Sequence, residues 1–203
     1  MNNMKKIATA VALLSLAAAG SASAAVQNVA LNKAVTLNGV FAMYGWDGAS
    51  NIAASTVTDG AYLADSTQWD HAVWWDAGRS VSANSSIQIN LGGKYSLTQF
   101  ALQGDNNDNY QVQYLSNGTW QNAWQANAVS GWGLASRSSG VLPAIVTDTL
   151  RITGTGGDRL YSVGEFQAFG VSAVPEPATY AMLLAGLGLI GFTARRKVAK
   201  QAV

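Results

Sequence analysis

The sequence predicts an all-β domain in which antiparallel strands form a sandwich or a jelly roll. Three observations support this: apolar and polar residues alternate in several short segments, turn signals separate these segments, and residues 25–174 show no helical pattern. This stretch also contains all seven Trp of the chain and is rich in Gly, Asn, Ser and Thr. Such a mixture suits a β-protein with functional loops.

Each predicted strand has one apolar and one polar face, as in a half-buried strand. Gly92-Gly93 predicts a turn after the first of these strands, and Asn117-Gly118 predicts a hairpin that leads to Trp120. The strands are expected within residues 87–91, 99–103, 110–114, 150–153 and 166–168.

The N-terminus has the three parts of a secretory signal peptide. Lys5 and Lys6 form a basic start, residues 7–19 are apolar, and residues 22–24 read Ala-Ser-Ala. We therefore expect a signal helix within residues 1–24 and cleavage by signal peptidase after Ala24. The alternative, a buried helix that begins a cytosolic domain, does not explain this order of charge, apolar run and small residues.

The C-terminus combines a tripeptide, an apolar run and a basic cluster. Pro175-Glu176-Pro177 is followed by residues 178–194, which carry no charge, and then by Arg195-Arg196-Lys197. A run of about 17 apolar residues is near the lower limit for a transmembrane helix, and flanking basic residues favour the cytoplasmic side. The predicted transmembrane helix therefore leaves residues 195–203 as a basic cytoplasmic tail and places the preceding domain outside the cytoplasm.

This arrangement resembles the PEP-CTERM sorting signal of Gram-negative bacteria. The resemblance implies that Pro175, Glu176, Pro177, Arg195 and Arg196 form the sorting motif. It also implies that the chain is anchored in the inner membrane at first. An exosortase-type membrane protease would then release it to the cell surface or the extracellular matrix. A plain C-terminal anchor is the alternative.

The predicted organisation is a signal peptide (1–24), a β-domain (25–171), a linker with the Pro-Glu-Pro motif (172–177), a transmembrane helix (178–194) and the tail. Residues 25–174 carry six basic and ten acidic side chains, a net charge of −4. An acidic domain without a basic stripe argues against nucleic acid as a partner. The chain has no cysteine, so neither a disulfide nor a thiolate metal site can form.

Several segments, in order, resemble the motifs of discoidin domains, also called coagulation factor five/eight C-terminal-type domains. The resemblance implies an eight-stranded jelly-roll β-sandwich of the galactose-binding type. It also implies binding through loops at one end, to sugars in many bacterial members. The matching segments are residues 28–33 (NVALNK), 57–60 (VTDG), 87–92 (IQINLG), 110–114 with 118–120 (YQVQY, GTW), 150–154 (LRITG) and 164–170 (GEFQAFG).

The same resemblance implies a structural calcium ion bound by Asp59 and Glu165. Carboxylate oxygens are suitable calcium ligands, and turn carbonyls could complete the shell. The alternative is an Asp that caps a turn and a Glu at a strand edge. Residues 105–109 (DNNDN) resemble the start of an EF-hand, but Tyr110 replaces the required Gly and Ser116 the required Glu, which favours an ordinary polar turn.

The predicted ligand site combines aromatic, acidic and amide side chains. Sugar sites use aromatic faces against C–H surfaces and charged or amide groups for hydroxyls. The alternative for each Trp is a place in the core, and His71 by itself favours a hydrogen-bonded loop residue over a metal ligand. The candidates are Trp69, Asp70, His71, Trp75, Arg79, Asp105 and Asn107, and Trp46, Asp47 and Trp132 could join them from neighbouring loops.

The function predicted from these features is an exported, non-enzymatic binding module with polysaccharide as its partner. The chain has no Gly-x-Ser-x-Gly elbow, zinc motif or phosphate loop. Asp70 and Asp76 are the pair that a glycosidase could use, but the sequence does not place them relative to each other. The alternative is a structural or adhesive surface protein that contacts protein and has no sugar site.

Overall fold

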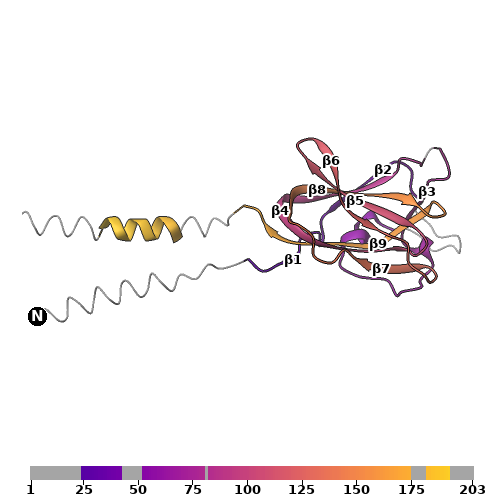
Figure 1. The fold of residues 1–203 in the computed structure, drawn as a ribbon, viewed down its shortest axis with the longest axis horizontal. Helices are drawn as coiled ribbons and strands as arrows, with labels where there is room; N and C mark the ends of the chain where they lie inside the picture. Colours follow the sequence, from indigo (N-terminus) through magenta and orange to yellow (C-terminus); the bar gives the residue numbers. More distant parts are fainter. Residues whose placement is uncertain (1–23, 43–51, 81, 175–181, 193–203) are drawn as a thin grey trace, which may run out of the picture.

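The computed structural model describes residues 24–42, 52–80, 82–174 and 182–192 and shows an antiparallel β-sandwich (Figure 1). All strand pairs among these residues are antiparallel, so the predicted fold class is confirmed. The elements are β1 (Gln27–Asn28), β2 (Ala34–Asn38), η1 (Ala54–Thr58), η2 (Trp69–His71), β3 (Val73–Asp76), β4 (Ser86–Asp105), β5 (Asn109–Ser116), β6 (Thr119–Ala126), β7 (Leu134–Ser138), β8 (Ile145–Gly156) and β9 (Leu160–Ser172).

The long strand β4 belongs to both layers of the sandwich. Its first part pairs with β2 and β8, and its second part pairs with β9 and β7. The register shifts between Asn90 and Tyr95, where Gly92 has a φ of 76° and its N–H donates to Asn90 Oδ1 at 2.8 Å. The expected turn at Gly92-Gly93 is therefore a bend within one strand, because bulges let a strand pass from one sheet to the other.

The core lies between the two layers. Ile87 and Ile89 of one layer are fully buried, as are Phe100 and Phe166 of the other. Tyr110 of β5 meets Tyr161 of β9 across the sandwich, with ring centroids 5.8 Å apart. The alternating apolar positions of the predicted strands thus supply the buried face of each sheet.

The predicted hairpin at Asn117-Gly118 is confirmed between β5 and β6. Both turn residues have positive φ, 49° for Asn117 and 76° for Gly118. A two-residue loop with this backbone matches the right-handed twist of the strands, which is why Asn-Gly is a strong hairpin signal.

The chain enters and leaves the sandwich at the same end (Figure 1). Gln27 of β1 pairs with Gly170 near the end of β9, whereas Leu160, where β9 begins, pairs with Asp76 of β3. The second half of β4 runs antiparallel to β9, so Asp105 lies at the end of the sandwich opposite the termini. We call this opposite end the loop end.

Residues 182–192 form a helix. Within the described ranges, no helix combines the length and the apolar character needed to cross a bilayer. The predicted transmembrane helix, residues 178–194, extends beyond the described residues. The signal peptide up to Ser23, the sorting residues Pro175 to Pro177 and the basic tail also lie outside them.

Candidate functional site

Three connections meet at the loop end. The β8–β9 turn contacts the turn after β3, where the N–H of Ala77 donates to the carbonyl of Arg159 at 2.9 Å. It also contacts the β4–β5 loop, where Asn107 Nδ2 donates to Asp158 Oδ2 at 2.9 Å. The predicted site residues Arg79, Asp105 and Asn107 therefore gather around a turn that the sequence analysis did not include.

The Trp-rich segment is more buried than expected for a ligand surface. Trp75 is 1% exposed and packs between Phe41 and Tyr161, each with ring centroids 5.2 Å away. Trp74, on the opposite face of β3, is 7% exposed and forms a T-shaped pair with Trp69, with ring centroids 5.1 Å apart. Ala42 bridges to Trp74 along one edge of β3 and β9 pairs along the other, so both edges of this strand are paired, while the ring contacts cover its two faces.

These positions separate the first four ligand candidates. Trp75 lies in the core and offers no ring face to a ligand, and Asp70 is buried as well. Trp69 and His71 are half-buried, and their η2 turn places His71 at the wall of a cavity. The core alternative that the sequence analysis raised for each Trp therefore applies to Trp75.

The cavity beside His71 has a volume of about 280 Å³. Tyr62 and Leu63 form an aromatic and apolar part of its wall, and both are partly open to solvent, with 41% and 39% exposed. Asp59 lines the same cavity. The structure thus brings one ligand candidate, His71, and one metal candidate, Asp59, to a single cavity.

Glu165 is fully buried below the turn that contains Asp59. Its Oε2 accepts a hydrogen bond from the N–H of Gly60 at 3.2 Å, and its Oε1 has no hydrogen-bond partner among the described residues. Burial raises the pKa of Glu165 to about 7, and the charge of Asp59 adds to this rise. The Gly60 amide and the Gln167 side chain act in the opposite direction and lower the pKa. The two carboxylates therefore lie near each other, as the resemblance implies.

Asp59 also caps its own turn, since its Oδ1 accepts the N–H of Ala61 at 2.8 Å. Glu165, in contrast, lies in the middle of β9 and not at a sheet edge. A buried carboxylate with one unpartnered oxygen beside a second carboxylate fits an oxygen-coordinated cation. The residues present thus fit the implied calcium ion.

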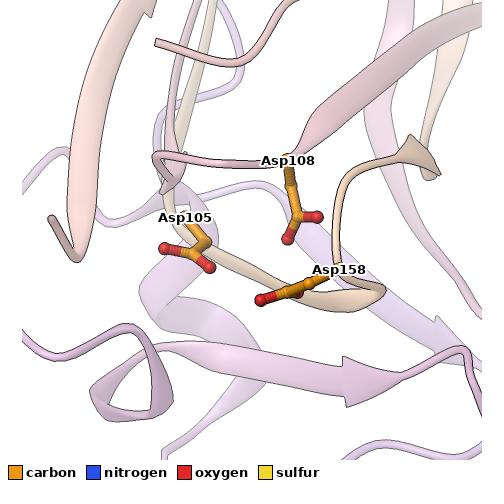
Figure 2. A group of neighbouring side chains, drawn as sticks. All are labelled: Asp105, Asp108 and Asp158. Atoms are coloured by element: carbon orange, nitrogen blue, oxygen red, sulfur yellow. The ribbon is translucent and has the colours of Figure 1, made fainter. Parts of the chain in front are cut away.

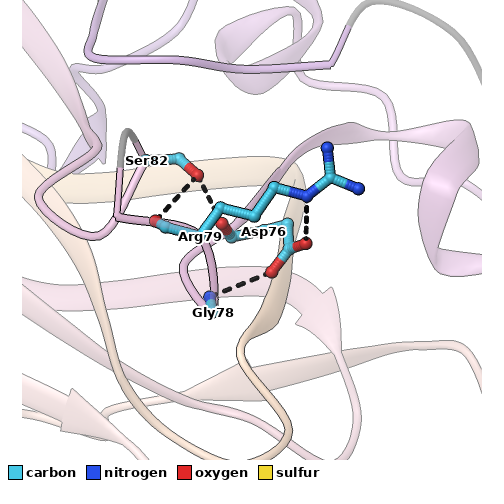
Figure 3. A network of polar contacts seen from close by, with 4 residues as sticks. All are labelled: Asp76, Gly78, Arg79 and Ser82. Atoms are coloured by element: carbon cyan, nitrogen blue, oxygen red, sulfur yellow. Dashed lines mark hydrogen bonds and ion pairs between the residues drawn. The ribbon is translucent and has the colours of Figure 1, made fainter.

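Arg79 projects from the turn after β3 (Figure 3). Its side chain is 78% exposed, and its Nε donates to Asp76 Oδ2 at 2.9 Å. Asp76 Oδ1 accepts the N–H of Gly78 at 2.9 Å, and Ser82 Oγ donates to the carbonyls of Asp76 and Arg79. This network orders the turn and leaves the outer edge of the guanidinium open to solvent.

Asp105 and Asn107 occupy different environments although they are two residues apart. Asn107 is exposed, whereas Asp105 is buried beside Asp108 of the same loop and Asp158 of the β8–β9 turn (Figure 2). Burial raises the pKa of Asp105 to about 6 and that of Asp108 to about 7, and the charge of Asp158 adds to both shifts. Asp105 is thus a partner of other carboxylates and not an exposed ligand contact.

Sequence reasoning missed Asp108, Asp158 and Tyr62 as members of a site. Asp158 is fifty residues from Asp108 in the chain, and only the pairing of β5 with β8 brings their loops together. Trp132, which is 59% exposed, lies in a loop that Asn106 holds through hydrogen bonds to the carbonyls of Val129 and Gly131. No motif links these distant residues, so an alternation pattern alone could not have found them.

Comparison with known families identifies the end of the chain. Residues 173–197 match the PEP-CTERM protein-sorting motif, which confirms the resemblance stated for the C-terminus. No curated protein matches the chain.

Similar solved structures include several carbohydrate-related modules. Chitosan-binding module 1 of a chitosanase/glucanase from Paenibacillus sp. IK-5 has 21% identity and a TM-score of 0.47, over 71% of this chain and 99% of the module. The lectin domain of lectinolysin, complexed with Lewis B antigen, has 14% identity and a TM-score of 0.47, over 70% and 96%. The family 32 module of NanJ from C. perfringens, in complex with galactose, has 14% identity and a TM-score of 0.43, over 66% and 93%.

Proposed function

We propose that this chain is an exported carbohydrate-binding module and that the cavity beside His71 receives one sugar ring. The observation that supports this most directly is the composition of the cavity wall, which combines Tyr62 and Leu63 with the polar groups of His71 and Asp59. Sugar rings present C–H faces to aromatic and apolar groups and hydroxyls to polar groups.

The size of the cavity agrees with a small ligand. Its volume of about 280 Å³ is close to the lower end of the range for ligand pockets, roughly 300–1,000 Å³. We infer that the cavity binds a terminal or branching sugar of a polysaccharide and leaves the rest of the polymer outside. The proposal contains no catalytic step, because Asp70 is buried and Asp76 is held by Arg79 and Gly78.

A calcium ion held by Asp59 and Glu165 is a second part of the proposal. When bound, the ion would neutralise two nearby carboxylates and stabilise the turn that forms one wall of the cavity. Chelator should lower the melting temperature of wild type, and added calcium should restore it. Asp59→Ala should be less stable than wild type and should no longer bind calcium at this site. A melting curve that chelator leaves unchanged would favour the turn-cap interpretation of Asp59.

A glycan array tests the sugar proposal, with His71→Ala and Tyr62→Ala as the variants. We expect each variant to lose at least about tenfold in affinity for the glycan that wild type selects, and to keep its melting temperature within a few degrees. Trp120→Ala is the aromatic control, because Trp120 lies on β6 beside the hairpin and outside this cavity. Equal binding by wild type and both variants would place the sugar elsewhere.

The second candidate is a structural or adhesive surface protein that contacts other proteins. The burial of Trp74 and Trp75 favours it, because these rings stabilise the fold and are not displayed for a ligand. A wild-type protein that binds no glycan on the array and still attaches to cell-surface protein would support this alternative.

We also propose that the tail directs export. The sorting motif at residues 173–197 supports release by an exosortase-type membrane protease, after signal peptidase has removed the N-terminal segment. The protein would be held in the inner membrane until this cleavage and would then reach the cell surface or the extracellular matrix.

A further inference from the structure

Three carboxylates from separate parts of the chain converge at the loop end. Asp105 ends β4, Asp108 precedes β5, and Asp158 lies in the turn between β8 and β9. One oxygen from each side chain lies within 4.8 Å of the others, and Figure 2 shows the three groups turned toward a common space. We call these residues the Asp105–Asp108–Asp158 cluster.

Asp108 is the residue that distinguishes this cluster from an ordinary acidic surface. Its side chain is 0% exposed, and neither carboxylate oxygen has a hydrogen-bond partner among the described residues. The amides of Arg159 and Asp158 approach it closely enough to lower its pKa, but neither reaches hydrogen-bond geometry. A buried charge without a partner is costly, so the Asp108 carboxylate is suited to binding a cation.

The nearby arginines do not supply this group. Arg137 Nη2 donates to the main-chain carbonyl of Asp105, and its guanidinium lies 5.5 Å from the centre of the Tyr110 ring. In the part of the chain that the structure describes, neither Arg137 nor Arg159 forms an ion pair with the three carboxylates. The charge of Arg137 lowers the pKa of Asp105 without forming an ion pair with it.

Neighbouring side-chain and backbone groups hold the cluster in place. Asp158 Oδ2 accepts from Asn107 Nδ2 and its Oδ1 accepts the N–H of Leu160, each at 2.9 Å. A Cβ at Gly157 would collide with Asp108 Oδ1 and would lie 2.7 Å from the carbonyl oxygen of Asn107. The absence of a side chain at Gly157 therefore allows the β8–β9 turn to lie directly against Asn107 and Asp108 of the β4–β5 loop.

We propose that Asp105, Asp108 and Asp158 bind one calcium ion, which joins the β4–β5 loop to the β8–β9 turn. Calcium takes six to eight oxygen ligands at about 2.3–2.6 Å, and carboxylates, a backbone carbonyl and water are its usual ligands. The ligands come from two loops, which is why the comparison with a single EF-hand loop does not detect the site. This site is separate from Asp59 and Glu165, and the proposal does not depend on the sugar-binding function.

Calorimetric titration of the purified full-length protein with CaCl₂ tests the proposal. Asp108→Asn and Asp158→Asn remove one charge each with little change in shape, Asp65→Asn is the exposed control, and Glu165→Gln removes the other proposed site. We expect one calcium ion to bind to Glu165→Gln. Adding Asp108→Asn or Asp158→Asn to that variant should weaken binding by at least about tenfold, and adding Asp65→Asn should not.

Melting curves give a second readout that a purely structural role would not produce. At a hundredfold excess over its dissociation constant, calcium should raise the melting temperature of Glu165→Gln by roughly 5–10 °C. In chelator, adding Asp108→Asn should raise the melting temperature, because it removes a buried charge. Absence of calcium binding to Glu165→Gln, unchanged binding after either substitution in the cluster, or an equal response to MgCl₂ would overturn the proposal.

Discussion

Trp75 shows how the role of one large aromatic residue depends on its surroundings. Its ring is 1% exposed between Phe41 and Tyr161, so its removal would open a cavity in the core. We expect Trp75→Ala to lower the free energy of unfolding by about 3–5 kcal/mol, measured by urea denaturation. Trp132→Ala, at a ring that is 59% exposed, should change it by no more than about 0.5 kcal/mol. Similar losses for both would contradict the assignment of Trp75 to the core.

Glu165 makes the stability of the calcium-free protein depend on pH. The pKa of Glu165 is raised from 4.5 to about 7 in the folded state, so the folded protein binds its proton more tightly than the unfolded chain does. The contribution of Glu165 to the free energy of unfolding is therefore fully present below pH 4.5. It is lost as the pH rises to about 7, and the loss is on the order of 3 kcal/mol.

This prediction can be checked by denaturation in chelator at several pH values between 4 and 8. Glu165→Gln should reduce the decline in stability across this range, because the amide has no proton to lose. Asp105 and Asp108, whose pKa values are also raised, should cause the decline that remains. Stability that rises with pH in chelator would show that Glu165 is not held in a costly charged state.

At the scale of elements, the Tyr110 hydroxyl connects three strands. Its oxygen accepts the N–H of Asp105 at the end of β4 at 3.0 Å and the N–H of Ser162 in β9 at 3.1 Å, while its ring lies in the core. This contact holds together the strands that carry the Asp105–Asp108–Asp158 cluster.

We expect Tyr110→Phe to lower the free energy of unfolding by about 1–3 kcal/mol, because two buried N–H groups would lose their acceptor. Thermal and chemical denaturation would measure this loss. Tyr114→Phe is the matched control, since Tyr114 lies on the same strand and its hydroxyl has no hydrogen-bond partner in the described ranges. Equal stability of the two variants would show that the Tyr110 hydroxyl does not hold these strands together.

For the molecule as a whole, the positions of the chain ends and of the loops are related. β1 and the end of β9 pair at one end of the sandwich, and the three connections that carry Arg79, Asn107 and Asp158 lie at the other. A membrane-held precursor would therefore direct its loop end away from the tail.

The sorting motif allows a prediction about release. Replacing both Pro175 and Pro177 with Ala should leave an uncleaved protein in the membrane fraction, because the protease would no longer recognise its signal. Immunoblots of membrane and extracellular fractions measure this, with substitution of Pro143, which lies in the β-domain, as the control. Normal release of the double variant would contradict the role assigned to the Pro-Glu-Pro motif.

The sequence by itself determined the strand pattern, the Asn117-Gly118 hairpin and the sorting motif. Each depends on residues that are adjacent or a few positions apart, so alternation, turn chemistry and a short motif are sufficient to predict it. The absence of disulfides followed equally directly from the lack of cysteine.

Only the tertiary structure decided which side chains face solvent and which distant residues meet. Trp75 is buried because the rings of Phe41 and Tyr161, which lie far away in the chain, pack against it, and local alternation does not report such contacts. Asp158 joins Asp105 and Asp108 because β4, β5 and β8 pair across long intervals of chain. Both arrangements arise from strand pairing over distance, since hydrogen bonds between strands determine positions that no local pattern contains.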